Sequence, residues 1–268
     1  MSDAGAAIQK IDKLTLVGLV LLLAPLLTVV HEVGGHGGAC LATGGAIKEI
    51  GAHYLDCAST SEANARLVSL AGAGIDVLVG ALAWLCWRAV HNPLLRTTLW
   101  MVAIDKLLLA AGYPLFSGVM NVGDFSVGAA RSLGALSPVW AWRVGFILLG
   151  LASYIAVVIL AIRMLHSMLG GSAITTMAQR QIPMTLYVVS GVVTLLAAIP
   201  NPIGPFIVFT SAAASFGGLA GLFNVAYQPP SAAEPKTFLI ARNWPLIGAG
   251  IAATAVFVLL FGPSIHLA

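Results

Sequence analysis

The sequence predicts an all-α membrane protein, a polytopic bundle of about six or seven transmembrane helices. Hydrophobic residues fill 59% of the 268 positions and charged residues only 9%, whereas a soluble domain carries about a quarter charged residues. Several apolar runs reach the roughly 20 residues that a helix needs to cross the hydrocarbon core. The ten-residue alternation typical of an outer-membrane barrel is missing, and helices are the other way to satisfy every backbone group in lipid.

Seven apolar segments are predicted to span the membrane, and together they form one membrane domain over residues 1–268. They cover residues 14–43, 66–90, 95–119, 139–168, 183–200, 204–226 and 245–262. The proline-rich stretch 199–205 must end a helix, because proline lacks an amide hydrogen and clashes with the preceding turn. The fifth and sixth segments therefore form a hairpin there, or one of them is re-entrant.

Lysine and arginine residues predict which end of the bundle faces the cytoplasm, since positive residues are retained on that side. With a cytoplasmic N-terminus, eight of them fall inside and four outside. The inside set is Lys10, Lys13, Arg88, Arg96, Arg163, Arg180, Lys236 and Arg242, and the outside set is Lys48, Arg66, Arg131 and Arg143. We therefore expect a multi-pass protein of the cell (inner) membrane with its N-terminus in the cytoplasm.

The charge distribution and the cysteines restrict the possible partners and compartment. The net charge of +3 is spread along the chain without a block of Lys or Arg, so no nucleic-acid partner is expected. Cys40, Cys57 and Cys86 are too few for a disulfide framework. Cys40 and Cys57 can pair if their loop lies outside the cytoplasm, where disulfides persist.

The end of the first apolar segment carries the strongest chemical signal in the chain. His31-Glu32-Val33-Gly34-Gly35-His36 places two imidazoles and a carboxylate within six residues. Ionisable groups inside transmembrane helices cost roughly 2.5 to 3.5 kcal/mol each on insertion scales, so such a cluster indicates a functional site. The alternative interpretation is that these are solvated helix-end residues at the membrane interface.

The spacing of the two histidines predicts a local distortion of the helix. In the H-E-x-x-H pattern the histidines lie at i and i+4 and bind one Zn²⁺. Here they lie at i and i+5, about 140° apart on an ideal α-helix, and point to different faces. A π-bulge restores them to one face, and Gly34 and Gly35 allow the backbone to deform. In the alternative register, Gly35 takes the place of the second histidine and the site lacks one ligand.

A catalytic zinc normally has three protein ligands and a water, so a third ligand is needed. The candidate carboxylates are Asp76, Asp105 and Asp124 within or beside helices, and Asp56 and Glu62 in the first loop. Asp124 follows the third helix in a glycine-rich bend, where it either points back into the bundle or caps a helix. Asp105 and Lys106 point about 100° apart, which favours pairing with other helices.

Three elements, in this order, resemble the site-2-protease-type intramembrane zinc metalloproteases. His31-Glu-Val-Gly-Gly-His36, followed by Ala39-Cys-Leu-Ala-Thr-Gly-Gly45, is similar to their H-E-x-x-H signature and the small residues after it, with one residue more between the histidines. Ala71-Gly-Ala-Gly-Ile-Asp76 is similar to their Ala-Gly-Pro-x-x-Asn element, with Asp76 at the Asn. Asn121-Val-Gly-Asp124 stands where the family has an Asn and its ligand Asp, although Phe125 replaces the Gly that follows.

The resemblance covers residues 14–130 and implies a protease-like core of three helices there, with additional transmembrane helices in 139–268. It implies that His31, His36 and Asp124 bind Zn²⁺ and that Glu32 is the general base. It also implies that Asn121 helps to hold the substrate or the oxyanion. The expected cofactor is therefore Zn²⁺, and the expected partners are a membrane protein and the lipid bilayer.

Three functions are consistent with the sequence. The first is an intramembrane zinc metalloprotease that hydrolyses a peptide bond of a membrane protein through a zinc-activated water. The second is a non-catalytic member of that fold, acting as a partner or assembly subunit in a membrane complex. The third is a small transporter or channel, which predicts that Asp76, Asp105 and Lys106 face one water-filled cavity and that no metal binds.

Overall fold

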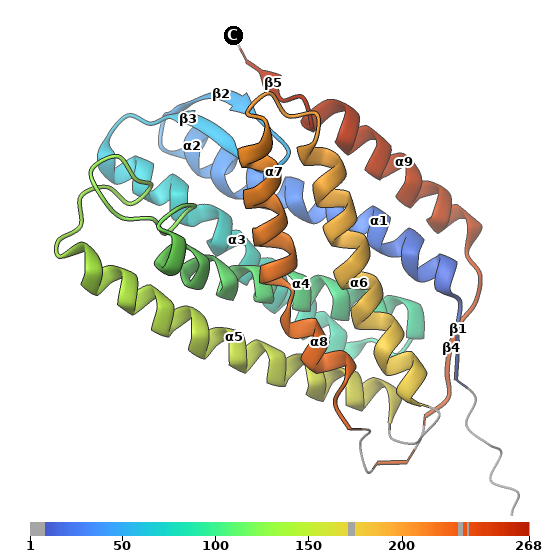
Figure 1. The fold of residues 1–268 in the computed structure, drawn as a ribbon. Helices are drawn as coiled ribbons and strands as arrows, with labels where there is room; N and C mark the ends of the chain where they lie inside the picture. The colour runs from blue at the N-terminus through green and yellow to red at the C-terminus, as the bar shows by residue number, and fades with distance from the viewer. Residues whose placement is uncertain (1–8, 171–174, 230–232, 235, 268) are drawn as a thin grey trace, which may run out of the picture.

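The computed structural model describes residues 9–170, 175–229, 233–234 and 236–267. Within these residues, seven helical spans are long and apolar enough to cross a membrane (Figure 1). They are Lys13–Ala42, Glu62–Ala89, Pro93–Met120, Val139–Leu169, Met177–Ala198, Pro205–Ala226 and Trp244–Phe261. Each overlaps a predicted segment, so the all-α polytopic bundle is confirmed.

Two of the spans are composed of shorter helices. The first consists of α1 (Lys13–Val29), the π-helix η1 (Val30–Gly37) and α2 (Gly38–Ala42). The sixth consists of α7 (Pro205–Ala212), the π-helix η2 (Ala213–Gly217) and α8 (Gly221–Ala226). The other spans are α3 (Glu62–Ala89), α4 (Pro93–Met120), α5 (Val139–Leu169), α6 (Thr175–Ala198) and α9 (Trp244–Phe261).

The bundle is held together by apolar contacts between neighbouring helices. α4 packs against α3 and α5, while α1 packs against α9 and α6 (Figure 1). Leu16, Trp100 and Leu165 are fully buried at these contacts. Trp100 also donates from Nε1 to the carbonyl oxygen of Ala161 at 3.2 Å, which satisfies the indole N–H and joins α4 to α5.

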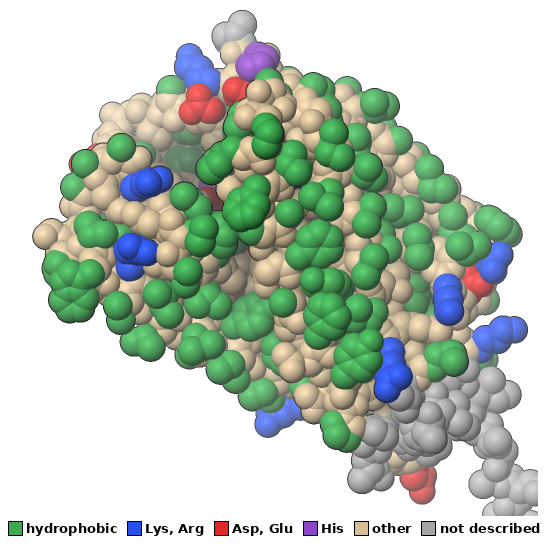
Figure 2. Space-filling model, viewed as in Figure 1, with side chains coloured by type: hydrophobic (Ala, Val, Ile, Leu, Met, Phe, Trp, Pro, Cys, Tyr) green, Lys and Arg blue, Asp and Glu red, His purple; other side chains and the backbone are tan. Residues whose placement is uncertain are grey.

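The outer surface of the helices is apolar, as a bilayer requires. Leu148 on α5 and Leu259 on α9 are 62% and 73% exposed. Figure 2 shows hydrophobic side chains over the middle of one face and charged side chains toward its two ends. A surface of this kind is stable only against lipid, so the chain is an integral, multi-pass membrane protein.

Small sheets lie at the two ends of the bundle. β1 (Gln9–Ile11) pairs in parallel with β4 (Phe238–Ile240), close to where α1 and α9 begin. At the opposite end, β2 (Ala46–Ile50) pairs with β3 (Leu55–Ala58) and β5 (Ile265–His266) in an antiparallel sheet (Figure 1). Residues 46–58 together with β5 are called the cap.

The fifth span begins earlier than predicted. The start expected at residue 183 is wrong, because α6 begins at Thr175 and Pro183 lies inside it. The hydropathy of the early part of α6 underestimates the helix, because a polar residue there is buried and has a partner within the protein. Gln179 is 2% exposed and donates from Nε2 to the carbonyl oxygen of Gln228 at 2.8 Å.

The proline-rich connection between α6 and α7 is a hairpin, one of the two predicted possibilities. Asn201 organises the turn, since its Oδ1 accepts from the amide of Ile203 at 3.1 Å. Its Nδ2 donates to the carbonyl oxygen of Gly262 at 3.0 Å. The turn is thereby fixed to the end of α9, beside the cap.

Candidate metal centre

His31, Glu32 and His36 lie on η1, the π-helical part of the first span. A π-helix has more residues per turn than an α-helix, so the chain returns to nearly the same face five residues after His31. The two imidazole rings are 4.9 Å apart between centroids and nearly perpendicular, at 83°. The π-bulge predicted from the spacing is therefore confirmed, and Gly35 packs against α3 instead of replacing a ligand.

Two glycines allow α3 to approach the histidines closely. A Cβ on Gly35 would lie 2.7 Å from Cα of Gly72. A Cβ on Gly72 would lie 2.7 Å from Nε2 of His31, and nearer still to Nε2 of His36. Real Cβ atoms do not make contacts this short, so both positions require glycine.

We expect Gly72→Ala to displace both imidazole rings and to weaken zinc binding by about tenfold or more, the scale on which disturbed support of metal ligands acts. The added methyl cannot be accommodated by a retreat of α3, since that would open the contact with Gly35. Zinc affinity of the purified protein, measured by competition with a chelator, tests this. Gly74→Ala is the matched control, because a Cβ on Gly74 meets nothing within 4 Å. An unchanged affinity in Gly72→Ala would contradict the ring positions described here.

The turn at the end of α4 brings Asp124 to the two histidines. Asn121 has the left-handed backbone conformation, with φ of 52°, and Gly123 has φ of 80°, so the chain reverses after α4. Asp124 Oδ2 lies 3.7 Å from His31 Nε2 and 3.5 Å from His36 Nε2. Of the two roles left open for Asp124, the structure favours the one in which it points back into the bundle.

Asn121 supports the loop that carries Asp124. Its Nδ2 donates to the carbonyl oxygen of Val127 at 3.1 Å, and its Oδ1 accepts from the amide of Val127 at 2.9 Å. Both polar ends of the side chain are therefore engaged within the loop. The role implied by the resemblance, contact with the substrate or the oxyanion, stays a prediction.

The hydrogen-bond partners of the two Nδ1 atoms determine whether each Nε2 carries a hydrogen or a lone pair. His31 Nδ1 lies 2.8 Å from Asp76 Oδ2, and His36 Nδ1 lies 2.7 Å from the carbonyl oxygen of Val68. A carboxylate or carbonyl oxygen only accepts, so each Nδ1 carries the hydrogen and each Nε2 of a neutral ring presents a lone pair. The lone pairs of His31 Nε2 and His36 Nε2 therefore lie close to the carboxylate of Asp124.

Three electron-rich atoms in this arrangement repel one another unless a metal ion or a proton lies between them. Zinc binds imidazole nitrogen at 2.0–2.1 Å, so neighbouring ligands of a tetrahedral ion are about 3.4 Å apart. The distances of 3.5 and 3.7 Å from Asp124 to the histidines match this value. Asp124 Oδ2 is buried and has no hydrogen-bond partner among the described residues. The residues present therefore fit a zinc ion.

A buried ion pair lies on the Nδ1 side of the His31 ring. Lys106 Nζ is 2.8 Å from Asp76 Oδ1, with the two side chains 1% and 0% exposed. The other oxygen of the same carboxylate holds His31 Nδ1, an arrangement that orients the ligating ring in many metal sites. The prediction that Lys106 pairs with another helix, rather than with Asp105, is confirmed.

Glu32 lies beside the histidines with one carboxylate oxygen free. The residue is 5% exposed, and its Oε2 has no hydrogen-bond partner among the described residues. One oxygen of the carboxylate lies within 4.8 Å of a potential ligand atom on each of His31 and His36. A carboxylate in this position can accept a proton from a water bound at the centre.

The candidate centre opens on a cavity of about 360 Å³, which we call the central cavity. Its lining includes His31, Glu32, His36 and Asp124. Another part of the wall comes from α6, α7 and η2 and carries the hydroxyl groups of Ser190, Thr194, Thr210, Ser211 and Ser215. The hydroxyl oxygens of Ser190 and Ser211 are buried without a hydrogen-bond partner among the described residues.

Sequence reasoning missed this hydroxyl wall, because single hydroxyls do not interrupt an apolar run. The available signal was their spacing: Ser190 and Thr194 are four residues apart, as are Ser211 and Ser215, so each pair shares a helix face. His53 of the cap also lines the cavity, and its isolated position in the sequence gave no indication of this. Burial lowers the pKa of His53 to about 4, against the opposing effect of its hydrogen bond to the Thr194 carbonyl, so the ring is neutral at pH 7.

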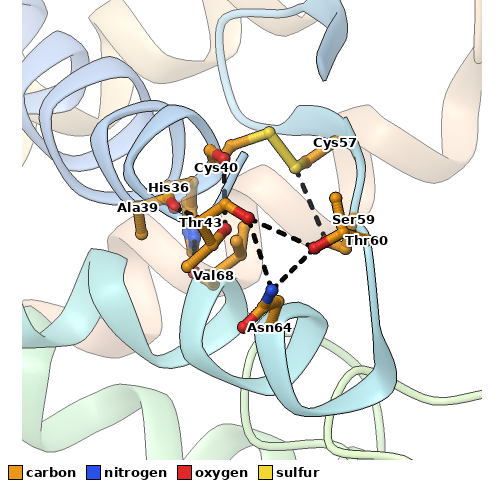
Figure 3. Close-up of a disulfide and its surroundings, with 9 residues drawn as sticks. All are labelled: His36, Ala39, Cys40, Thr43, Cys57, Ser59, Thr60, Asn64 and Val68. Carbon is orange, nitrogen blue, oxygen red and sulfur yellow. Dashed lines mark hydrogen bonds between the residues drawn. A yellow bond between two sulfur atoms is a disulfide. The ribbon is translucent and has the colours of Figure 1, made fainter. Parts of the chain in front are cut away.

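A disulfide joins the cap to the helix that carries the metal motif (Figure 3). Cys40 on α2 is bonded to Cys57 on β3, so the pairing that the sequence allowed is present. Figure 3 shows His36 close to this bond, one turn before Cys40. The carbonyl oxygen of Thr43 accepts from Thr60 Oγ1 at 3.2 Å. The cap is therefore held directly beside the candidate centre.

Comparisons with known proteins add no assignment. A scan against protein-family models, a search of curated proteins and a search of solved structures each found no match. The function of the chain must therefore be argued from its own residues and their geometry.

Proposed function

We propose that the chain is an intramembrane zinc metalloprotease that hydrolyses a peptide bond of a membrane protein. The observation that carries this proposal is the convergence of His31 Nε2, His36 Nε2 and Asp124 Oδ2. Beside them lies Glu32, whose Oε2 has no hydrogen-bond partner among the described residues. Structural zinc sites are almost always closed by four protein ligands, whereas three protein ligands and one open position are typical of catalytic sites. The central cavity provides the space in which a substrate would reach that position.

The roles of the residues follow from this geometry. His31, His36 and Asp124 hold the zinc, which when bound polarises a peptide carbonyl and lowers the pKa of a bound water. Glu32 accepts the proton of the attacking water at its free oxygen and passes it to the nitrogen of the leaving amine. Asp76 keeps the hydrogen on Nδ1 of His31, so that Nε2 stays available as a ligand.

The surroundings of the centre favour a substrate within the membrane. The cavity lies among helices that span the bilayer, so a segment that enters it comes from lipid or from the membrane interface. A helical peptide bond is hydrogen-bonded internally, so the substrate must be locally extended at the cut. Ser190 and Ser211 line the cavity, and their hydroxyls have no hydrogen-bond partner among the described residues. These hydroxyls can rotate to bind the exposed backbone of such a segment.

The orientation that we propose places the N-terminus in the cytoplasm and the candidate centre near the outer face. The cap end of the bundle holds the disulfide, and disulfides persist outside the reducing cytoplasm. That end has only four Lys and Arg residues against eight at the other, as expected when positive residues stay inside. Two independent observations therefore support the same orientation.

The two rival functions make different demands on the same residues. A transport path requires free charges along the cavity, and Asp105 and Lys106 do line it. Lys106, however, is bound to Asp76, which in turn holds His31, so its charge supports the candidate centre. A non-catalytic subunit would cut nothing, whether or not it binds zinc, which a cleavage experiment distinguishes.

We expect Glu32→Gln to keep its zinc and to lose peptidase activity by about a hundredfold or more, the range that a positioned general base contributes. Glutamine preserves the size of the side chain but does not accept the proton. The measurement uses the protein in liposomes with a mixture of membrane proteins, and mass spectrometry of newly formed N-termini reports cleavage.

Glu62→Gln is the matched control, since Glu62 is an exposed residue at the start of α3 that pairs with Arg66. It should cut as the native protein does. New termini produced equally by Glu32→Gln would refute the proposed mechanism. Zinc binding with no cleavage by the native protein would favour the non-catalytic role.

A further inference from the structure

We propose that a second cavity, formed by α4, α5 and η2, binds a large apolar side chain of the substrate next to the scissile bond. This inference rests on the proposed function and names the class of residue that the site selects. The cavity has a volume of about 280 Å³, near the lower limit of roughly 300 Å³ for small-molecule pockets. It therefore suits a single side chain rather than a whole peptide helix.

The second cavity adjoins the central cavity. Leu109, Tyr113, Phe116 and Ala214 line both. The ring of Tyr113 stacks on His31, with 4.9 Å between centroids and 10° between planes. One aromatic ring therefore separates the second cavity from a candidate metal ligand, a distance that the side chain of a residue adjoining the bound carbonyl can reach.

The lining of the second cavity selects for apolar groups. It is formed by Leu, Val, Met, Phe, Ala, Gly and Tyr residues, and none of the described residues that line it is charged. The hydroxyl of Tyr154 donates to the carbonyl oxygen of Gly218 at 2.8 Å and accepts from the amide of Gly221 at 2.7 Å. The hydroxyl of Tyr154 is thus already hydrogen-bonded as donor and as acceptor. Only the ring of Tyr154 remains to contact a side chain in the cavity. A polar side chain placed in this cavity would lose its hydration with little compensation.

The second cavity is also accessible from the lipid-facing surface. Val119 and Met120 at the end of α4 line it and are 55% and 50% exposed. On one side of the cavity two segments of the chain approach closely, since a Cβ on Gly112 would lie 3.5 Å from Cα of Gly218. A transmembrane segment that approaches from the bilayer can therefore insert one side chain while its backbone remains at the centre.

Gly217 on η2 provides a way to fill this cavity. It lines the second cavity, and a Cβ at this position meets nothing within 4 Å. Gly217→Phe therefore places a ring in or across the space without a backbone clash. Ala213→Leu fills the same cavity with a smaller group, and serves as a second variant. Gly145→Phe on α5 is the matched control, since a Cβ on Gly145 also meets nothing within 4 Å and the residue does not line the second cavity.

The test measures binding of metal-chelating hydroxamates to the full chain, loaded with Co²⁺ and held in lipid nanodiscs so that no detergent chain fills the cavity. Acetohydroxamate, which has no side chain, reports the metal centre alone through the Co²⁺ absorption spectrum. The hydroxamates of N-acetyl-alanine, N-acetyl-leucine and N-acetyl-asparagine then report the second cavity. Leucine and asparagine have nearly the same shape, so their difference measures polarity.

We expect the leucine hydroxamate to bind about tenfold or more tightly than the alanine and asparagine compounds, as one apolar group in a fitted pocket allows. In Gly217→Phe and Ala213→Leu this preference should fall to about twofold or less, since the filled cavity excludes the side chain. Gly145→Phe should retain the full preference.

Three results would overturn the inference. Acetohydroxamate binding with equal affinity for the three amino-acid compounds would refute the second cavity while leaving the proposed metal centre intact. A phospholipid retained by the native protein and lost in Gly217→Phe, with the hydroxamate preference unchanged, would identify a lipid site instead. No Co²⁺ spectrum and no response to acetohydroxamate would reject both the inference and the proposed function.

Discussion

The His31→Ala/His36→Ala double variant is expected to lose its zinc completely, from about one ion per chain to none, because a catalytic site depends on its three protein ligands. Asp124 alone cannot hold the ion against water. The double change also removes the lone pairs that repel Asp124, so the apoprotein should fold. Metal loss would therefore reflect the missing ligands rather than a collapsed bundle.

Elemental analysis of protein purified without chelator measures this directly. His91→Ala/His266→Ala is the matched control, since both residues lie outside the central cavity lining and it should keep its zinc. Glu32→Gln should also keep its zinc, because Glu32 is proposed to accept a proton and is not one of the zinc ligands. Zinc retained by the His31→Ala/His36→Ala variant would place the site elsewhere. A native protein without zinc would leave the non-enzymatic function as the better interpretation.

Lys106→Met is expected to destabilise the protein by about 3 to 5 kcal/mol, the usual result of removing one partner of a buried ion pair. Asp76 would keep a negative charge with no counter-ion at 0% exposure. Its carboxylate would then shift, and its hold on His31 would change. Zinc affinity should consequently fall by about tenfold to a hundredfold, as for other lost supporting contacts.

The double variant Asp76→Asn/Lys106→Met tests whether the effect of Lys106→Met comes from the unpaired charge of Asp76 or from the altered shape of the Lys106 side chain. An asparagine at position 76 can still accept from His31 Nδ1 through its amide oxygen, and no charge is left unpaired. Stability and zinc affinity should therefore recover in part relative to Lys106→Met. Thermal unfolding in lipid and chelator competition provide the two readouts, with Lys48→Met in the cap as control. Native-like stability of Lys106→Met would mean that Asp76 is not charged in the folded protein.

Much of the fold follows from local sequence. A run of about 20 apolar residues has to form a helix in lipid whatever its neighbours are, and all seven predicted segments overlap a span of the structure. The prediction failed only at the start of α6, where Gln179 is paired within the protein. Hydropathy cannot recognise a polar residue whose partner lies about fifty positions away in the sequence.

The metal motif was also predicted from neighbouring residues, but those residues did not decide its backbone geometry. The spacing of His31 and His36 left two registers open, and the sequence alone does not determine which backbone the motif adopts. In the structure, η1 has the wider turn, and Gly72 on α3 leaves room for both rings.

The sequence by itself determined that this is a multi-pass helical membrane protein with a histidine and glutamate cluster at the end of its first span. Only the tertiary structure decided that Asp124 meets that cluster, that Asp76 and Lys106 support it, and that α6 and α7 supply a hydroxyl wall. The physical reason is that hydropathy and helix period depend on neighbours in the chain. Convergence of side chains depends on where helices cross and how each is rotated about its own axis, and these are set by packing between residues far apart in the sequence.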